Sequence, residues 1–201
     1  MRFDQSILPD VSRLLVGILG GTGDQGRGLA IRLASAGQRI LIGSRTSERA
    51  ASAAKDIASI TGGSVEGDTN ADVASRADIV IVAVPFAGHA DTLAELRPQL
   101  DGKIVVDCVN PLGFDKQGPF ALGVPEGSAA EQAAALLPDS RVCAAFHHVS
   151  AELLADPSIE QMDLDVLVLG DDPEAVQIVQ ALASRISGMR GVFAGRLRNA
   201  G

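Results

Sequence analysis

Residues 14–26, LLVGILGGTGDQG, join a short apolar run to a glycine-rich turn. The apolar run is typical of a β-strand that is buried on both faces of a sheet. The turn fits the spacing G-x-G-x-x-G, and the residues that continue from it, 24–36, have helical periodicity. At such a junction glycines permit a tight turn, a close approach to a pyrophosphate and packing of the helix against the strand. The stretch therefore predicts a dinucleotide-binding turn made of Gly21, Thr22, Gly23, Asp24, Gln25 and Gly26.

The turn after the second expected strand, residues 43–49 (GSRTSER), indicates which nucleotide binds. An NAD site usually has an acid here, which accepts hydrogen bonds from the ribose hydroxyls. This turn instead offers Ser44, Arg45 and Arg49, and guanidinium groups are suited to bidentate contacts with phosphate. Cations are also unfavourable near a helix N-terminus unless an anion joins them. The sequence therefore favours NADP(H), with its 2′-phosphate, over NAD(H).

The alternation of apolar runs and helical segments continues along the chain. Strands are expected at 14–20, 40–42, 79–84, 104–106, 142–146 and 166–169, and helices at 24–36, 47–60, 70–76, 87–97, 128–137 and 174–187. Such alternation implies parallel strands with right-handed crossovers. We therefore expect an α/β fold, a doubly wound parallel sheet (a Rossmann NAD(P)-binding fold) with a small C-terminal α/β extension.

Three regions are expected along the chain: an N-terminal extension over 1–13, an NADP-binding domain over 14–146 and a small C-terminal substrate-side region over 147–201. Helix starts are indicated by the capping-box pattern of Ser128 with Glu131 and by Asp172 before Pro173. The glycine- and proline-rich segment 108–127 is too long for a routine connection, so we expect it to line the site.

Composition excludes several classes of partner and mechanism. The 201 residues include no Trp, no Tyr and 6 Phe, and they carry a formal net charge of −8. Without tyrosine, catalysis by a tyrosine–lysine pair, as in short-chain dehydrogenases, is excluded. The negative charge would repel a phosphate backbone, and few aromatic rings are present for base stacking. Nucleic acid is therefore not expected as a partner.

Cysteine and hydropathy patterns indicate a cytoplasmic protein. Cys108 and Cys143 lie far apart without C-x-x-C spacing, so we interpret them as small buried hydrophobic residues and expect neither a metal site nor a disulfide. No apolar run approaches the length of a membrane-spanning helix, and residues 1–13 lack the apolar core of a signal peptide. We therefore expect no membrane association.

Two stretches, GILGGTGDQGRGLAIRLASAG (17–37) and ILIGSRTSERA (40–50), resemble the NADP-binding half of the F420-dependent NADP reductases. Members of this family pass hydride between NADP(H) and the deazaflavin coenzyme F420. The resemblance continues at 84–86 (VPF), 109–112 (VNPL), 145–149 (AFHHV) and 169–172 (LGDD), so it spans nearly the whole chain from Leu14. It implies an NADP-dependent oxidoreductase of the 8-hydroxy-5-deazaflavin:NADP type.

The resemblance also implies the roles of individual residues. The turn from Thr22 to Gln25 would hold the pyrophosphate, and Ser44, Arg45 and Arg49 would hold the 2′-phosphate. The ribose and nicotinamide would lie along Val84, Phe86, Leu112 and Ala151. The deazaflavin ring would lie over the nicotinamide in a pocket bounded by Pro85, Phe86, Asn110, His147 and Val149.

The chain departs from the family pattern on the deazaflavin side. A second histidine, His148, and then Ser150 stand where an Ile-Pro step is usual. The chain also stops at residues 195–201 (GRLRNAG), where the family continues into one more apolar helix. Truncation, a pocket completed by a partner subunit and loss of the second substrate all fit this difference. Because the carboxyl edge of the sheet would be partly uncovered, we expect a homodimer.

No residue is expected to act as a catalytic acid or base. Hydride transfer between two carbon centres needs orientation and exclusion of water, and the coenzymes carry the chemistry. Either His147 or His148 is expected near the carboxyl edge of the sheet, where ligands bind in this fold. His89 is expected on a helix surface.

Two other functions fit the same sequence. One is NADPH-dependent reduction of a flavin, a ferric chelate or another acceptor on the same fold. The other is a non-catalytic NADP(H)-binding sensor or subunit.

Overall fold

The computed structural model describes residues 8–201, so the first seven residues of the expected N-terminal extension lie outside it. Eight strands form one sheet: β1 (Leu15–Leu19), β2 (Arg39–Ser44), β3 (Val65–Thr69), β4 (Ile79–Val82), β5 (Ile104–Asp107), β8 (Arg141–Ala144), β9 (Leu164–Gly170) and β10 (Met189–Gly195). Their order across the sheet is β10-β9-β8-β5-β4-β1-β2-β3. A separate hairpin joins β6 (Leu112–Asp115) to β7 (Gly118–Ala121).

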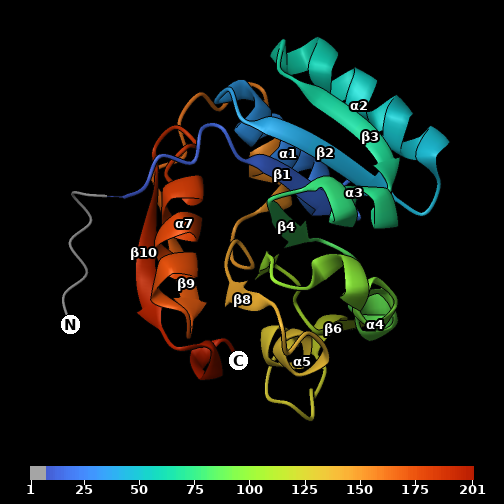
Figure 1. The fold of residues 1–201 in the computed structure, drawn as a ribbon, viewed down its shortest axis with the longest axis vertical. Helices are drawn as coiled ribbons and strands as arrows, with labels where there is room; N and C mark the ends of the chain where they lie inside the picture. Colours follow the sequence, from blue (N-terminus) through green and yellow to red (C-terminus); the bar gives the residue numbers. More distant parts are fainter. Residues whose placement is uncertain (1–7) are drawn as a thin grey trace.

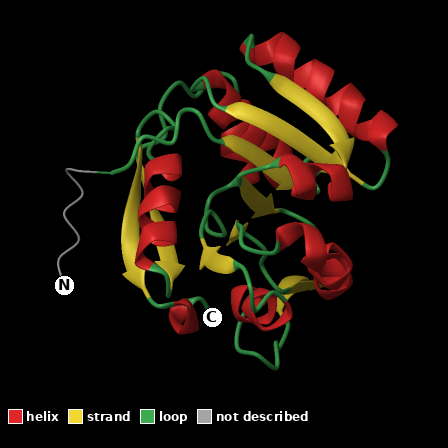
Figure 2. Ribbon diagram, in the orientation of Figure 1, coloured by secondary structure: helices red, strands yellow, loops and turns green. Residues whose placement is uncertain are grey.

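Helices cover the sheet on both sides (Figure 2). One apolar layer includes residues of α1 (Asp24–Ser35), α2 (Ser47–Thr61), α6 (Ala151–Ala155) and α7 (Pro173–Ala183). The other includes residues of α3 (Asn70–Arg76), α4 (His89–Leu100) and α5 (Ala129–Leu136). Along β4, Ile79 and Ile81 belong to the first layer and Val80 and Val82 to the second, as the two-residue period of a strand requires.

The expected doubly wound sheet is confirmed from β3 to β8. All neighbouring pairs in the series β3-β2-β1-β4-β5-β8 are parallel. The two predicted helix starts are also present: the Ser128 hydroxyl accepts a hydrogen bond from the Glu131 N–H at 3.1 Å, and the Asp172 carboxylate accepts one from the Ala175 N–H at 2.7 Å. Figure 1 shows α2 and β3 at one end of the sheet and β9, β10 and α7 at the other.

The fully parallel arrangement expected for the sheet is wrong at one pair, because β8 and β9 are antiparallel. The connection between them contains only α6, a helix of five residues. This helix is about 7.5 Å long, and it packs against α1 instead of carrying the chain along the sheet to its opposite edge. The chain therefore enters β9 at the edge where it left β8. Beyond this pair, β9 and β10 are again parallel.

Three further features were not expected from the sequence: the edge strands β3 and β10, the hairpin β6–β7, and α6. Strand β3, VEGDT, has no apolar run because it is an edge strand whose residues are only partly buried. The hairpin occupies the long segment 108–127, and its residues are largely exposed. The sheet continues without a break across residue 146, so the boundary proposed there stays a prediction.

Within residues 8–201, no helix is both long and apolar enough to cross a membrane.

Candidate dinucleotide-binding site

A cleft of about 950 Å³ opens at the carboxyl edge of the sheet. The chain order reverses there between β1 and β4, since β2 and β3 lie on one side and β5 and β8 on the other. Crevices at such a switch point are where doubly wound folds bind ligands. The walls come from Gly20, Thr22, Gly23, Asp24 and Gln25 after β1, Ser44, Arg45 and Arg49 after β2, Asn70 after β3, Ala83, Val84, Pro85, Phe86, Ala87, Gly88 and Thr92 after β4, and Cys108, Val109, Asn110, Leu112 and Phe114 after β5.

The glycine-rich turn needs two of its glycines for its own packing. A Cβ at Gly21 would lie 2.9 Å from the carbonyl oxygen of Ile18. A Cβ at Gly26 would lie 2.8 Å from the Cα of Gly21. Both glycines are buried, so their role is to bring the start of α1 close to β1.

Gly23 has a different environment. It is exposed, and a Cβ there would meet only the carbonyl oxygen of Gly20, at an ordinary 3.4 Å. Gly23 is also the N-cap of α1, and within residues 8–201 no side chain caps this helix start. Free N–H groups and the positive end of a helix dipole form a site for anions. The open space at Gly23 therefore fits a pyrophosphate.

Asn70, the first residue of α3, is a cleft residue that the sequence pattern did not indicate. Its Oδ1 accepts a hydrogen bond from the Gly20 N–H at 3.2 Å. The same oxygen would lie 2.6 Å from a Cβ at Gly43, so only glycine fits there. Asn70 thus ties the glycine-rich turn to the end of β2. The sequence did predict that a helix starts at residue 70. Because β3 was not expected, this prediction did not show that Asn70 lies beside the glycine-rich turn.

The side chains predicted to select the nucleotide surround the N-terminus of α2. Ser44 is buried at the end of β2, while Arg45 and Arg49 are exposed and line the cleft. Thr46 caps the helix by accepting a hydrogen bond from the Arg49 N–H at 3.5 Å. Among residues 8–201, neither guanidinium group forms an ion pair. Two cations without an acid partner beside a helix N-terminus fit a phosphate.

The opposite wall of the cleft is largely apolar. Val84, Pro85 and Phe86 follow β4, and Leu112 lies in the hairpin with 40% of its surface exposed. The sequence did not indicate Phe114, which also lines the cleft and is 77% exposed. These apolar side chains suit contact with the face of a flat ring, and nearby backbone and amide groups could bind the polar edge of that ring.

Residues 146–151 lie next to this wall. Phe146 is fully buried and has a φ of 65°, a left-handed conformation that is strained for a bulky side chain. Its carbonyl oxygen accepts a hydrogen bond from the Gln25 side chain at 3.1 Å, and that of His147 accepts one from the Asn110 side chain at 2.6 Å. Two predicted site residues therefore hold this strained segment against the glycine-rich turn and the β5 loop.

The remaining predicted site residues are not part of the cleft wall. His147 is half-buried, Val149 is buried in the core, and Ala151 begins α6. The contacts proposed for His147 and Val149 with the deazaflavin, and for Ala151 with the ribose and nicotinamide, stay predictions. Burial, together with repulsion from His148, lowers the pKa of His147 despite the opposing charge of Asp107, so its ring is neutral near pH 7.

The expectation that His89 lies on a helix surface is wrong. Its side chain is fully buried, and its Nε2 lies 2.6 Å from Oδ2 of Asp107, which is also buried. The two residues are 18 positions apart and meet because β4 and β5 are neighbours. The sequence around His89 does not indicate that Asp107 is its partner.

The cysteines are buried, as expected, and unpaired. Burial raises the pKa of the Cys143 thiol to about 12, and the pKa of the Cys108 thiol is also raised, first by burial and then by the Asp107 charge. Both side chains are therefore protonated at neutral pH. In the described range 8–201, no cluster of three or more metal-ligating side chains is found.

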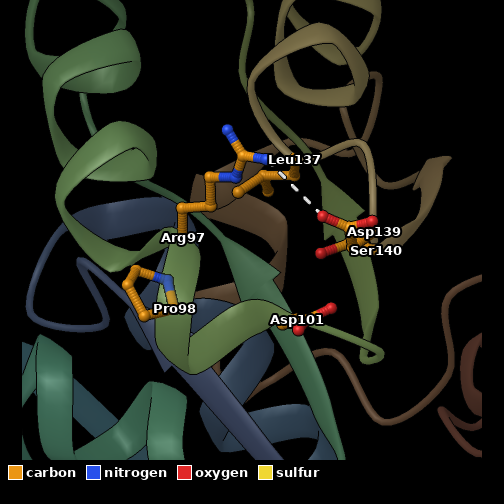
Figure 3. A pocket seen from close by; sticks show the side chains of 6 residues that line it. All are labelled: Arg97, Pro98, Asp101, Leu137, Asp139 and Ser140. Atoms are coloured by element: carbon orange, nitrogen blue, oxygen red, sulfur yellow. Dashed lines mark hydrogen bonds and ion pairs between the residues drawn. The ribbon is translucent and has the colours of Figure 1, made fainter.

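A second, smaller hollow of about 140 Å³ lies between the end of α4 and the start of β8 (Figure 3). It is lined by Arg97, Pro98, Asp101, Leu137, Asp139 and Ser140. Arg97, the cation among these lining residues, already lies 3.5 Å from the carboxylate of Asp139. The hollow is too small for a dinucleotide and lies at the amino edge of the sheet.

The glycine-rich turn and the turn at Arg45 both lie in a segment that matches a known protein family. Residues 15–111 match the family described as NADP oxidoreductase, coenzyme F420-dependent. The F420-dependent NADP reductase of Methanothermobacter thermautotrophicus is 42% identical over 192 residues, which are 92% of this chain and 82% of that protein.

Two further comparisons extend this result. The crystal structure of a putative F420-dependent NADP reductase from Arthrobacter sp. FB24 has a TM-score of 0.73 and 28% identity, with 93% of this chain and 88% of that chain covered. The metalloreductase STEAP3 of Rattus norvegicus is 35% identical over 169 residues, which are 84% of this chain and 31% of that protein.

Proposed function

The chain belongs to the family of coenzyme F420-dependent NADP oxidoreductases, and from this premise we propose that it transfers hydride between NADP(H) and coenzyme F420. The observation that carries the proposal is the pair of arginines, Arg45 and Arg49, which lack acid partners within residues 8–201 and share one cleft with the open glycine turn. These are the two anion sites that a 2′-phosphorylated dinucleotide requires.

The protein contributes position and exclusion of water. The turn around Gly23 would bind the pyrophosphate, and the start of α2 would bind the 2′-phosphate. Both lie on the cleft wall opposite Phe86 and Leu112, which would hold the nicotinamide ring flat. When bound, the two coenzymes supply the redox chemistry, since the nicotinamide carries a hydride that the deazaflavin can accept. No protein acid or base is required for this transfer.

The deazaflavin would lie against the nicotinamide on the side of Asn110 and His147. The Asn110 amide donates a hydrogen bond to the His147 carbonyl and so fixes the backbone at this position. The ring of His147 is neutral, so it adds no positive charge that would oppose the cation that develops on the nicotinamide. Reacting carbons held within about 3 to 3.5 Å would transfer hydride directly.

Transfer of deuterium tests the proposal. The purified chain is mixed with oxidised F420 and NADPH carrying deuterium at one of the two C4 positions, and the reduced product is analysed by mass spectrometry. We expect deuterium in reduced F420 from one of the two labelled forms, without exchange with solvent. Lack of transfer from either form at saturating concentrations would refute the proposed acceptor.

A second candidate function is NADPH-dependent reduction of a flavin or a ferric chelate. The observation that favours it is the similarity to the rat metalloreductase, of which this chain covers 31%. Parallel assays with NADPH and each acceptor separate the two functions, because only one acceptor should give turnover at low concentration. If no acceptor gives turnover while NADPH still binds, the chain is a non-catalytic NADP(H)-binding subunit.

We also propose that the protein is a cytoplasmic homodimer. Buried unpaired cysteines suit a reducing compartment. The hairpin exposes apolar side chains, and such surfaces tend to associate with a second copy.

A further inference from the structure

A buried charged pair lies directly behind the cleft. His89 and Asp107 are 0% and 1% exposed, and Nε2 of the ring is 2.6 Å from Oδ2 of the carboxylate. Neither residue lines the cleft, but both adjoin it. His89 follows the cleft residues 84–88, and Asp107 precedes the cleft residues 108–110.

The surroundings of the ring determine its protonation. Nδ1 of His89 lies 3.0 Å from Oε1 of Gln132 in α5. The Gln132 amide is oriented by its other end, since its Nε2 donates to the Glu126 carboxylate at 3.3 Å. Both ring nitrogens therefore face oxygen atoms that can accept a hydrogen bond, an arrangement that stabilises a proton on each nitrogen. The geometry favours an imidazolium at His89, paired with the Asp107 carboxylate.

Each member of the pair fixes one of the two cleft loops. The Phe86 ring stacks on the His89 ring, with centroids 6.0 Å apart and an angle of 27° between the planes, a distance at which an imidazolium attracts an aromatic face. The second oxygen of Asp107 accepts a hydrogen bond from the Val109 N–H at 3.0 Å. Breaking the pair would release Phe86 on one loop and Val109 on the other.

From these contacts we propose that His89 and Asp107 are positioning residues, which hold the β4 and β5 loops in the spacing that receives the nicotinamide half of NADP(H). The inference rests on the proposed function, because it concerns how the same cleft binds its dinucleotide. A contribution to folding stability does not by itself explain why this pair is present, since buried ion pairs are often no more stabilising than apolar residues of equal volume.

The groups that face His89 give the direction of its titration. Burial of the ring opposes its charge, but the hydrogen bond and charge of Asp107, with the bond to Gln132, outweigh burial and raise the pKa of His89. His147 also lies within the influence of Asp107 and is neutral near pH 7, so it does not replace His89. Asp91, the acid in the first turn of α4, is exposed. The proton on the ring is therefore kept below the raised pKa of His89 and is lost as the pH rises through it.

The experiment compares two ligands that share only the adenine half: NADPH and 2′,5′-ADP. We expect Asp107→Asn to weaken NADPH at pH 7 by at least fivefold while changing the affinity for 2′,5′-ADP less than twofold. Without the carboxylate the buried ring loses its proton near neutrality. In the variant, the ratio of the NADPH affinity to the 2′,5′-ADP affinity should return toward the wild-type value as the pH falls toward 5.5. In the wild type, this ratio should stay constant over the same pH range.

A destabilising variant away from the cleft provides the control. Val179→Ala removes buried contacts in α7, so it should lower stability and leave the affinity ratio and its pH dependence as in the wild type. If Asp107→Asn behaves in the same way, or weakens both ligands equally, the positioning role is refuted. If the wild type binds neither ligand, the proposed function fails and this inference fails with it.

A measurement on the unmodified protein covers the case in which Asp107→Asn does not fold. Nitrogen-15 NMR of the histidine rings at pH 7 should show protons on both nitrogens of His89 and on only one of His147. A neutral His89 ring would overturn the inference.

Discussion

Arg45 is exposed and forms no ion pair within residues 8–201, so its removal should change binding and leave stability nearly unchanged. The wild type should bind NADPH at least tenfold more tightly than NADH, about 1.4 kcal/mol. Arg45→Ala should remove most of this difference by weakening NADPH alone, because NADH has no 2′-phosphate. Titration calorimetry with both nucleotides measures it, and Arg39→Ala, on an exposed arginine at the other end of β2, is the control. Equal weakening of both nucleotides would contradict the assigned contact.

At the residue scale, the sequence predicted cleft residues that belong to one local segment. It missed contacts that form only when two segments distant in the sequence meet. Arg45 and Arg49 follow from a single turn after a strand. Asn70 could not be predicted, because its contact with Gly20 requires the unexpected strand β3. His89 was misplaced although β5 was expected, because nothing in the sequence shows that the end of that strand faces the start of α4.

Among the elements, α6 packs on α1 through Leu154, and Arg32 of α1 adds hydrogen bonds to its backbone. The Arg32 guanidinium donates hydrogen bonds to the carbonyl oxygens of Leu153 and Leu154 at 2.8 Å and of Asp156 at 2.7 Å, and to that of Ile159. Arg32→Ala would leave several of these carbonyls without their charged donor. We expect it to reduce the free energy of unfolding by about 2 to 4 kcal/mol, measured by urea denaturation.

Arg27 on the same helix provides the matched control for Arg32. Among residues 8–201 it forms one ion pair, which spans 4.0 Å to Asp56, and the two side chains are 34% and 61% exposed. Arg27→Ala should therefore cost less than about 1 kcal/mol. Hydrogen exchange should also increase over residues 151–159 in Arg32→Ala and not in Arg27→Ala. Similar losses in both variants would show that Arg32 does not fix α6.

At this scale the buried strands were predictable and the edge strands were not. A strand covered on both faces, such as β4 with IVIV, must be apolar throughout, which makes it visible in the sequence. Strand β3 needs no such run at the edge of the sheet. The antiparallel β9 was expected as a strand, but its direction depends on the path of the connection that contains α6, which the apolar pattern did not reveal.

The whole molecule places the cleft at one edge of the sheet and a group of exposed apolar side chains beside it. The hairpin carries Leu112, Phe114 and Phe120, which are 40%, 77% and 46% exposed, and Leu122 follows it with 38% exposed. Large apolar side chains gathered in this way usually mark an interaction surface. Because Leu112 and Phe114 also line the cleft, association through the hairpin would cover part of its mouth.

We therefore expect light scattering to give about twice the chain mass of 20.7 kDa at micromolar concentrations. Phe120→Ser should shift the protein toward the monomer, because Phe120 lies on the hairpin and is absent from the cleft wall, whose binding groups it leaves in place. Ile60→Ser is the matched control, since Ile60 is 56% exposed on α2, and it should leave the mass unchanged. A mass near 20.7 kDa for the wild type at every concentration would refute the homodimer, whereas a dimer unaffected by Phe120→Ser would place its interface on another surface.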